Sequence, residues 1–350
     1  MENKIKCVVW DLDNTIWDGT LLEGDNLVFT AQNENIIKTL DSRGILHSIA
    51  SKNEYSHAKE QLETLKIWDY FLCPQINWNP KSNSIKKIAE ALNIGLDSIA
   101  FIDDSPYEIE EVKYSLPEVT CINAGHLHDV IDMACMQPNF ITEDSKNRRA
   151  MYQADITRKE IEDIFEGPKE EFIKSLKMKF NIKKAQLEDL KRAEELTIRT
   201  HQLNTTGYTY SYDELCSFQE SDRYRLLIAG LDDKFGSYGK IGISLIECEK
   251  DEWKVKLFLM SCRVISRGVG NVFLNYIIES ARNKKVRLTA EFKHTDKNRL
   301  MYATYKFAGF KDIEEKNGVS LLEYDFNINT SFPDYIELEI ESNIFMRDEI

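Results

Sequence analysis

The sequence predicts an α/β domain with a parallel, Rossmann-like sheet, followed by a second, α+β domain. In the first part, apolar runs at residues 7–10, 45–50 and 98–102 each end in polar or acidic residues. Helical patterns of about ten to twelve residues separate these runs, and such alternation is typical of parallel sheets. In the second part, three strand patterns follow one another at 223–231, 238–247 and 253–261. That succession favours an α+β domain.

Length and composition favour a soluble two-domain protein. The chain has 350 residues, of which 42% are hydrophobic and 30% charged, so each domain can build a core. No run of 18 uncharged apolar residues occurs, and the first four residues lack the apolar segment of a signal peptide. We therefore expect a cytoplasmic protein without a membrane partner. The net charge of −14 disfavours binding to nucleic acid, which requires cationic surface.

The seven cysteines show neither C-x-x-C nor paired spacing. This pattern argues against a disulfide framework or a zinc site, so we expect most cysteines to be reduced and packed in the core.

The first domain can be followed element by element. After the strand at 7–10, helical apolar spacing predicts a helix at 34–43 that stops before Gly44. A second strand at 45–50 precedes a helix at 54–65, and Tyr70-Phe71-Leu72 is predicted as a short strand. A helix near 84–92 then leads to the strand at 98–102. We place this domain at residues 1–140.

The second half begins with a charge-rich helical segment, which we interpret as a linker at 141–176. A strand is predicted at 177–183 and an amphipathic helix at 186–199. After the three strands, Gly268-Val269-Gly270 leads into a further helix, and Asp296-Lys297-Asn298 opens another. We place the second domain at 177–326 and a C-terminal tail at 327–350.

Polar side chains cluster where the strands of the first domain end. Asp11 and Asp13 follow the first strand, Ser51 the second, and Asp103 and Asp104 the third. Because parallel strands present their carboxyl ends at one edge of the sheet, these groups should share a site. Lys81, at the head of a helix, can approach the same edge.

These residue types suit phosphoryl transfer with Mg²⁺. Asp11 would attack phosphorus, and Asp13 would protonate the leaving oxygen and later activate water. Ser51 would donate a hydrogen bond to the phosphoryl group and Lys81 would offset its charge. We expect Mg²⁺ to be held by Asp11, the main-chain carbonyl of Asp13, Asp103 and the nearby Asp104.

The motifs D-L-D-N-T, the strand-terminal serine, the lysine and I-D-D-S-P, in this order, resemble the haloacid dehalogenase (HAD) phosphatase superfamily. Only short segments separate the motifs, which leaves little room for a large cap domain. The resemblance therefore implies an open site able to admit a bulky or protein-bound substrate.

The second domain resembles the GNAT acyltransferase fold. The resemblance lies in a central strand, R-G-V-G, a helix, another strand and Asn…Tyr…Gly-Phe. Such a fold splays two strands to admit a pantetheine arm, and a glycine turn at a helix N-terminus binds anions or amides. Ile265 stands where GNAT loops carry Gln or Arg, so we expect a carrier-bound phosphopantetheine arm instead of coenzyme A.

A HAD domain followed by a GNAT-like domain is the layout of the FkbH-like proteins, which the chain also resembles in Q-L-N-T-T-G and M-S-C-R-V-I-S-R-G-V-G. That family implies a glyceryl transferase and phosphatase. It would take the glyceryl unit of 1,3-bisphosphoglycerate, remove its phosphate and load the unit on an acyl carrier protein.

The resemblance places the acyl-holding cysteine at Cys262, beside Arg263 and a helix N-terminus, surroundings that favour thiolate. His201 is a candidate base for attack by the pantetheine thiol. Substrate or pantetheine contacts are expected from Asn204, Thr205, Arg263, Arg267, Gly268, Gly270 and Asn298.

The acidic carrier requires a cationic surface on an acidic enzyme. Residues 282–299 carry a net charge of about +5 and would steer the carrier if their cations share one face. An ordinary solvated surface is the alternative.

Two other functions remain open from the sequence. The chain would be a HAD phosphatase with a regulatory or carrier-docking GNAT-like module, or a docking scaffold without activity. The intact set of Asp11, Asp13, Lys81 and Asp104 weighs against the scaffold.

Overall fold

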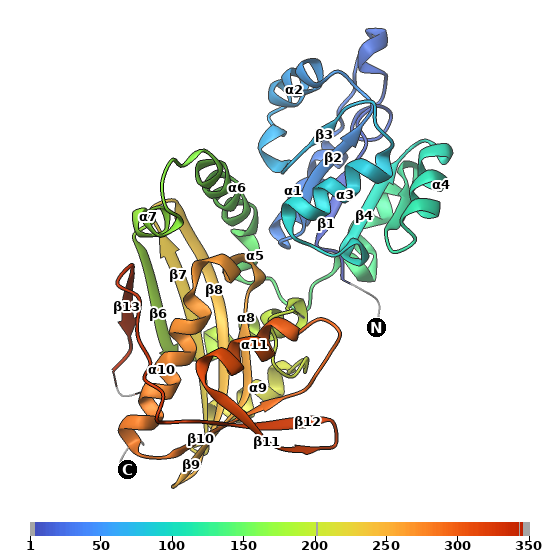
Figure 1. Cartoon of the computed structure of the whole chain (residues 1–350). Coiled ribbons are helices and arrows are strands. Elements are labelled where there is room, and N and C mark those ends of the chain that lie inside the picture. Colours follow the sequence, from blue (N-terminus) through green and yellow to red (C-terminus); the bar gives the residue numbers. More distant parts are fainter. Residues whose placement is uncertain (1–3, 201, 343, 346–350) are drawn as a thin grey trace. The chain divides into compact units, whose positions relative to one another are not determined.

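The computed structural model describes residues 4–200, 202–342, 344 and 345, and it divides into two compact units at Ile156/Thr157 (Figure 1). The boundary lies within one helix, α6 (Arg148–Ile164). Residues 141–156 therefore belong to the first unit and 157–176 to the second. No helix among the described residues is long and apolar enough to cross a membrane.

The first unit is built on a five-stranded, wholly parallel sheet with the order β3-β2-β1-β4-β5, which confirms the predicted Rossmann-like fold class. Its strands are β1 (Cys7–Trp10), β2 (Leu46–Ser51), β3 (Gln75–Ile76), β4 (Ile99–Asp103) and β5 (Thr120–Asn123). Its helices are α1 (Ala31–Ser42), α2 (Tyr55–Thr64), α3 (Lys81–Leu92), α4 (Pro106–Ser115) and α5 (Glu143–Lys146), with short 3₁₀ turns η1 (Leu21–Glu23), η2 (Trp68–Tyr70), η3 (Leu96–Ser98), η4 (Ala124–Asp132) and η5 (Ala134–Met136).

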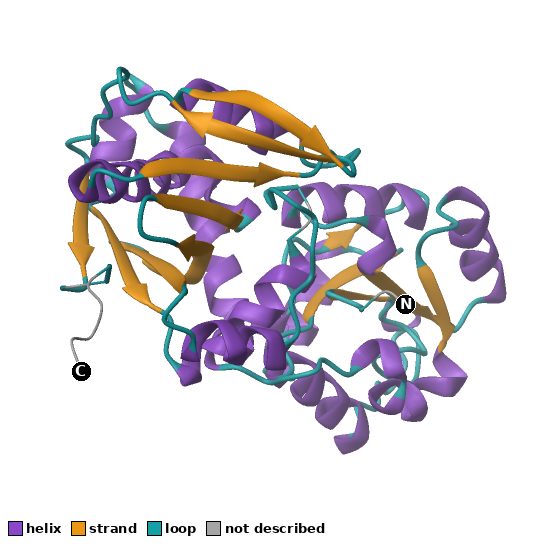
Figure 2. Ribbon diagram, turned by 90° about the horizontal axis from the view of Figure 1, so that it is seen from below, coloured by secondary structure: helices purple, strands orange, loops and turns teal. Residues whose placement is uncertain are grey.

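Helices cover both faces of this sheet because β1 is apolar on both sides (Figure 2). Val8 and Trp10 pack with α1 and α2. Cys7 and Val9 point to the other face and pack with α3 and α4. The central strand is thus buried on both faces, as expected for a parallel sheet with helical crossovers.

The predicted strand at 70–72 is wrong. Tyr70 ends η2, Phe71 makes a single isolated bridge to His47, and the strand β3 begins only at Gln75. Cys73 adopts a left-handed conformation with φ 49°, so the chain turns there and cannot continue as a strand.

The second unit is built on an eight-stranded mixed sheet with the order β11-β12-β10-β9-β8-β7-β6-β13, which confirms the predicted α+β class. The strands are β6 (Met178–Lys184), β7 (Tyr224–Asp233), β8 (Gly236–Cys248), β9 (Glu252–Met260), β10 (Arg287–Phe292), β11 (Phe310–Lys316), β12 (Val319–Tyr324) and β13 (Ile336–Ile340). Its other elements are α7 (Lys169–Ser175), α8 (Leu187–Arg199), α9 (Tyr212–Glu220), η6 (Cys262–Arg267), α10 (Val269–Lys284) and α11 (Arg299–Ala308).

The helices of the second unit pack on opposite faces of its sheet. Apolar residues of α7, α10 and α11 share one core with the sheet, whereas those of α8 and α9 form the other. Two strand pairs are parallel, β9 with β10 and β6 with β13. The pairing of β9 with β10 ends before the carboxyl ends of both strands.

A buried ion pair joins α6 to the β7–β8 hairpin. Arg158 and Asp233 are fully buried, and Arg158 Nε and Nη2 donate to the carboxylate at 2.8 Å each. The guanidinium also stacks on the ring of Tyr238, 3.8 Å from its centroid. Removing the carboxylate would take two charge-assisted hydrogen bonds from a buried guanidinium.

We therefore expect Asp233→Ala to lower the free energy of unfolding of the second unit by about 3–5 kcal/mol. The matched control, Asp334→Ala, removes the carboxylate of the exposed Lys174–Asp334 pair and should cost about 0–1 kcal/mol. Hydrogen exchange of the β7 amides in urea measures both. Equal effects of the two variants would contradict the structural role of the buried pair.

Candidate active site

Three neighbouring strands of the first unit bring polar side chains to one edge of the sheet. Asp11 directly follows β1, Ser51 ends β2 and Asp103 ends β4. The amide of Asp11 still donates to the carbonyl of Ile102 at 2.9 Å, so the strand pairing fixes the backbone of Asp11 beside β4. The predicted meeting of these strand ends is present in the structure.

A hydrogen-bonded chain in the core holds the end of β1. Trp10 Nε1 donates to His47 Nδ1 at 3.0 Å, and His47 Nε2 lies 3.1 Å from the carbonyl of Ile37. Because Nδ1 accepts, Nε2 carries the hydrogen and donates to that carbonyl. Burial lowers the pKa of His47 to about 3, so the ring stays neutral. The residue before Asp11 is thereby fixed to α1.

Lys81 joins the two buried carboxylates. Its Nζ lies 2.7 Å from Asp11 Oδ1 and 2.5 Å from Asp103 Oδ2, and all three side chains are at least nine-tenths buried. As the first residue of α3, directly after Pro80, Lys81 starts its helix at this edge of the sheet. Two carboxylates in such a space require a cation between them.

Burial dominates the electrostatics of this cluster. It raises the pKa of Asp11 to about 6; Lys81 opposes that rise and Asp103 adds to it. Burial likewise raises the pKa of Asp103 against the attraction of Lys81. Burial would lower the pKa of Lys81, but Asp11 and Asp103 outweigh it and the net direction is upward. The lysine is therefore a permanent cation of the site.

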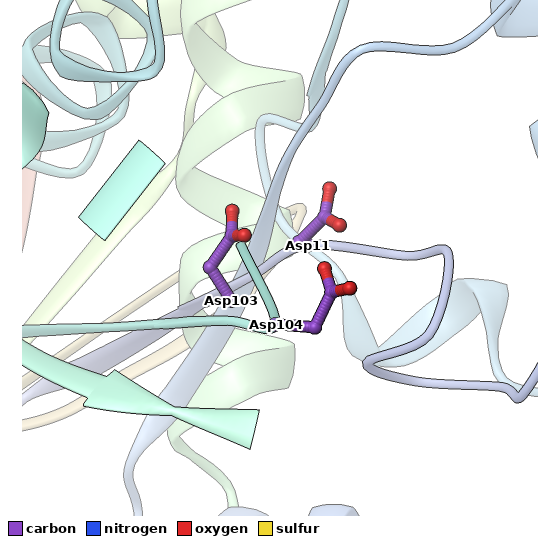
Figure 3. Close-up of side chains that lie close together, drawn as sticks. All are labelled: Asp11, Asp103 and Asp104. Carbon is purple, nitrogen blue, oxygen red and sulfur yellow. The ribbon is translucent and has the colours of Figure 1, made fainter. Parts of the chain in front are cut away.

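Asp104 completes a group of three carboxylates that suits a divalent cation. One oxygen from each of Asp11, Asp103 and Asp104 lies within 4.8 Å of the others, and Figure 3 shows the three carboxylates together at the end of their strands. Asp104 is exposed, which leaves an approach from solvent. With Lys81, the ionised cluster carries two excess negative charges. Its all-oxygen donors and its charge fit Mg²⁺.

The carboxylate of Asp13 lies outside this group. Its Oδ1 accepts hydrogen bonds from Trp17 Nε1 at 2.9 Å and from the Leu21 amide at 3.1 Å, and its Oδ2 accepts one from Asn53 Nδ2 at 3.0 Å. Asp13 could therefore serve a cation only through its main-chain carbonyl, as expected from the sequence. Its carboxylate is held in one orientation, which suits a proton donor and acceptor.

Asn53 is a site residue that the sequence reasoning missed as a functional group. It is 1% exposed and orients Asp13 from the loop after β2. Its position two residues after the strand-terminal Ser51, which is itself buried, was the available signal. A polar residue at that position lies at the same edge of the sheet.

In the second unit, the gap between β9 and β10 is filled by the chain itself. The pairing of the two strands ends at Val255 and Ala290, although both strands continue. Beyond that point the segment Leu203–Thr205 lies against β9: the Met260 amide donates to Leu203 O at 2.9 Å and the Thr205 amide to Phe258 O at 3.1 Å.

Thr205 bridges both strands. Its Oγ1 accepts from the Phe258 amide at 3.0 Å, and its carbonyl accepts from the Lys293 amide at 3.0 Å, just beyond β10. Its hydroxyl and its carbonyl thereby close the space between the two strands. The expected contact of Thr205 with a substrate or a pantetheine arm stays a prediction.

Asn298 and Asn204 also form hydrogen bonds with the backbone of neighbouring loops. The side-chain amide of Asn298 donates to Asn204 O at 3.0 Å and to Lys293 O at 2.9 Å, and its Oδ1 accepts from the Thr295 amide at 3.0 Å. Asn204 Oδ1 accepts from the Gly207 amide at 2.9 Å. Both asparagines hold loops in place, and their expected substrate contacts stay a prediction. His201 lies outside the described residues.

The turn between β9 and α10 places Cys262 as predicted, half-buried at the start of η6. The neighbouring cations are directed elsewhere. Arg263 donates to the carbonyl of Tyr238, and Arg267 is 7% exposed and paired with Glu162 at 3.0 Å. Arg267 therefore anchors the turn to α6, and its expected contact with a substrate or a pantetheine arm stays a prediction.

Gly268 is required by the backbone of this turn, whereas Gly270 is not. Gly268 has φ 75°, and a Cβ there would lie 2.9 Å from Tyr335 Oη. A Cβ on Gly270 would meet Met260 at an ordinary 3.5 Å. Of the two glycines in the predicted binding turn, only Gly268 is thus required by the backbone.

Comparison with known proteins identifies a class for the first unit. Residues 10–79, which include Asp11, Asp13 and Ser51, match the model of the haloacid dehalogenase-like hydrolase family. The match begins at Trp10, the last residue of β1, includes β2 and β3, and ends before Lys81. No curated protein matches the chain.

Solved structures resemble each unit separately. The N-terminal part of protein BF1531 from Bacteroides fragilis, which contains a phosphatase domain complexed with Mg, is 31% identical over 37% of this chain and 40% of that one, with a TM-score of 0.34. The PaiA N-acetyltransferase of Thermoplasma acidophilum, in complex with coenzyme A, is 15% identical over 42% of this chain and 99% of its own, with a TM-score of 0.35.

The ribosomal-protein-S18-alanine N-acetyltransferase of Escherichia coli is 16% identical over 43% of this chain and 99% of its own, with a TM-score of 0.34. Together, the family match and the parallel sheet describe a HAD-like first unit, and the second unit is an α+β domain on an eight-stranded mixed sheet.

The carboxylate group predicts that Mg²⁺ stabilises the first unit. Binding at one hundred times the dissociation constant adds about 2.7 kcal/mol to the free energy of unfolding. We expect Mg²⁺ to raise the thermal midpoint of the wild type, and Asp11→Asn and Asp104→Asn to lose most of that rise. Asp129→Asn, at an exposed aspartate in η4, should keep it. An undiminished rise in Asp104→Asn would argue against this site.

Gly268→Ala should lower the free energy of unfolding of the second unit by about 1–2 kcal/mol, because alanine is strained at this φ and its Cβ meets Tyr335. Gly270→Ala should change it by less than about 0.5 kcal/mol. Urea unfolding of the two variants tests this difference, which disappears if the turn adopts another conformation in solution.

Proposed function

We propose that the first unit is a Mg²⁺-dependent phosphatase. The observation that carries this proposal is the buried Asp11–Lys81–Asp103 cluster beside Asp104 at the carboxyl ends of parallel strands. When bound there, Mg²⁺ would hold the phosphoryl oxygens beside the carboxylates and reduce the repulsion between the anions. The reaction belongs in the cytoplasm, as expected from the sequence.

The residues of the chain supply the covalent and proton-transfer steps. A carboxylate oxygen of Asp11 forms a bond to phosphorus as the bond to the leaving oxygen breaks, and Asp13 gives that oxygen a proton. Asp13 then takes a proton from water, which attacks the aspartyl phosphate and releases inorganic phosphate. Asn53 and Trp17 keep the Asp13 carboxylate oriented for both steps.

For the whole chain we propose glyceryl transfer. The thiolate of Cys262 attacks the carbonyl carbon of 1,3-bisphosphoglycerate, the bond to the acyl phosphate breaks, and inorganic phosphate leaves. The Asp11 site removes the 3-phosphate. The phosphopantetheine thiol of an acyl carrier protein then takes the glyceryl group and frees Cys262. The half-buried position of Cys262 at the turn before α10 supports this role.

A second candidate is a phosphatase whose GNAT-like unit regulates it or docks a carrier. One observation favours this alternative: Leu203–Thr205 occupies the gap between β9 and β10 that the GNAT fold uses for the acyl arm. For glyceryl transfer, the carrier's arm must displace this segment or approach Cys262 by another side.

Mass spectrometry separates the two candidates. After incubation with 1,3-bisphosphoglycerate and Mg²⁺, we expect a glyceryl or phosphoglyceryl increment on the wild type and none on Cys262→Ala. Cys216→Ala, at another half-buried thiol of the second unit, is the matched control and should keep the increment. Asp11→Asn should retain the 3-phosphate on the acyl group. Phosphate release by Cys262→Ala at the wild-type rate, with no acylated wild type, would favour the alternative.

A further inference from the structure

The outer face of α11 is apolar although it points away from the core. The helix buries Met301 and Tyr305 against the sheet. On the opposite side, Leu300 is 49% exposed and Phe307 is 91% exposed. Seven residues separate them, which is two helical turns, so both lie on one stripe with Ala303 and Thr304 between them. We call these four residues the α11 face.

Large exposed apolar side chains in a row are expected to face solvent only until a partner covers them. A solvent-facing helical stripe is ordinarily polar. The α11 face is therefore a candidate contact surface, and its charges indicate which partner fits.

Three cations lie at the N-terminal end of the α11 face. Lys293, Lys297 and Arg299 are all exposed, and within residues 4–200, 202–342, 344 and 345 none of the three forms an ion pair. Asp296 is the one acidic residue of the sequence between Lys293 and Arg299. In a chain with a net charge of −14, this uncompensated group is a local positive site.

The rest of the basic stretch identified in the sequence lies elsewhere. Lys284 ends α10 and Lys285 follows it, before β10 begins, whereas Lys293 follows the other end of β10. A six-residue strand separates the two groups by about 20 Å. In addition, Arg287 is paired with Glu323 at 2.7 Å. The cations of residues 282–299 therefore fall into two separate groups, and only one of the two groups adjoins the α11 face.

That group also adjoins the closed gap of the sheet. The Lys293 amide donates to Thr205, and Asn298, directly before Arg299, holds Asn204 and Lys293. A partner bound at this end of α11 would be next to the segment that fills the space between β9 and β10.

We propose that the α11 face with Lys293, Lys297 and Arg299 is the docking surface for an acidic acyl carrier protein. This rests on the proposed function, and it adds the place and the charge chemistry of the contact. Acidic side chains of the carrier meet the three cations, and one apolar side chain of its recognition helix covers Phe307. A stripe of two turns buries little area, which suits a transient partner that must leave after each transfer.

The test measures binding of the full-length chain to a purified acyl carrier protein, with and without its phosphopantetheine arm, by isothermal titration calorimetry at low and moderate salt. We expect Lys297→Glu/Arg299→Glu and Phe307→Ser each to weaken binding by about tenfold or more. The charge variant should also reduce the salt dependence. The arm-free carrier should show the same losses, since the contact is with the protein surface.

Lys284→Glu/Lys285→Glu is the matched control, because it reverses the same number of charges in the other group. It should stay within about twofold of the wild type. All variants should keep the wild-type free energy of unfolding of the second unit in urea, which shows that the mutated unit is folded.

The outcomes separate this proposal from the proposed function. If the wild type binds and loads the carrier and the α11 variants do so equally well, the docking surface is wrong and the function stands. Equal losses in both charge variants would likewise overturn a localised surface. If the wild type hydrolyses phosphomonoesters but neither binds nor loads the carrier, the docking surface and the glyceryl transfer are overturned and the phosphatase stands. Self-association that Phe307→Ser abolishes, with unchanged carrier binding, would assign the α11 face to a second copy of the chain.

Discussion

The ion cluster of Asp11, Lys81 and Asp103 is the constraint on which the first unit depends. Two carboxylates at adjacent strand ends are buried, so a cation has to lie between them, and Lys81 does so at 2.7 and 2.5 Å. The sheet, the start of α3 and the turn after β1 must all be in place for these three side chains to meet. The same arrangement places Asp11 and Asp103, together with Asp104, around a position that suits a divalent ion.

In the second unit, Thr205 closes the gap between the diverging strands β9 and β10. Parallel strands that diverge leave unpaired backbone groups, and buried unpaired groups are costly. Thr205 satisfies both strands at once, with its hydroxyl toward β9 and its carbonyl toward the end of β10. These hydrogen bonds satisfy backbone groups in the ligand-free protein. A ligand that enters between β9 and β10 therefore has to replace each of them.

Much of the first site was predictable because it follows from local rules. Apolar runs ending in Asp11, Ser51 and Asp103 indicate buried parallel strands, and parallel strands place their ends together. What escaped prediction depends on contacts between distant segments. Arg267, for which a pantetheine contact was expected, pairs with Glu162, which lies far back in the sequence. Likewise, the strand predicted at 70–72 is absent because the chain turns at Cys73, whose positive φ the composition does not reveal.

The last strand has a consequence for how copies of this protein behave together. β13 pairs in parallel with β6, Leu338 opposite Phe180, and so covers an edge that would otherwise offer open main-chain groups. The new edge carries Glu337 and Glu339, both exposed. Both lie within ion-pair distance of Lys179 of β6, and edge strands with charged side chains resist pairing between molecules. An acidic C-terminal strand thereby protects an eight-stranded sheet against edge-to-edge aggregation.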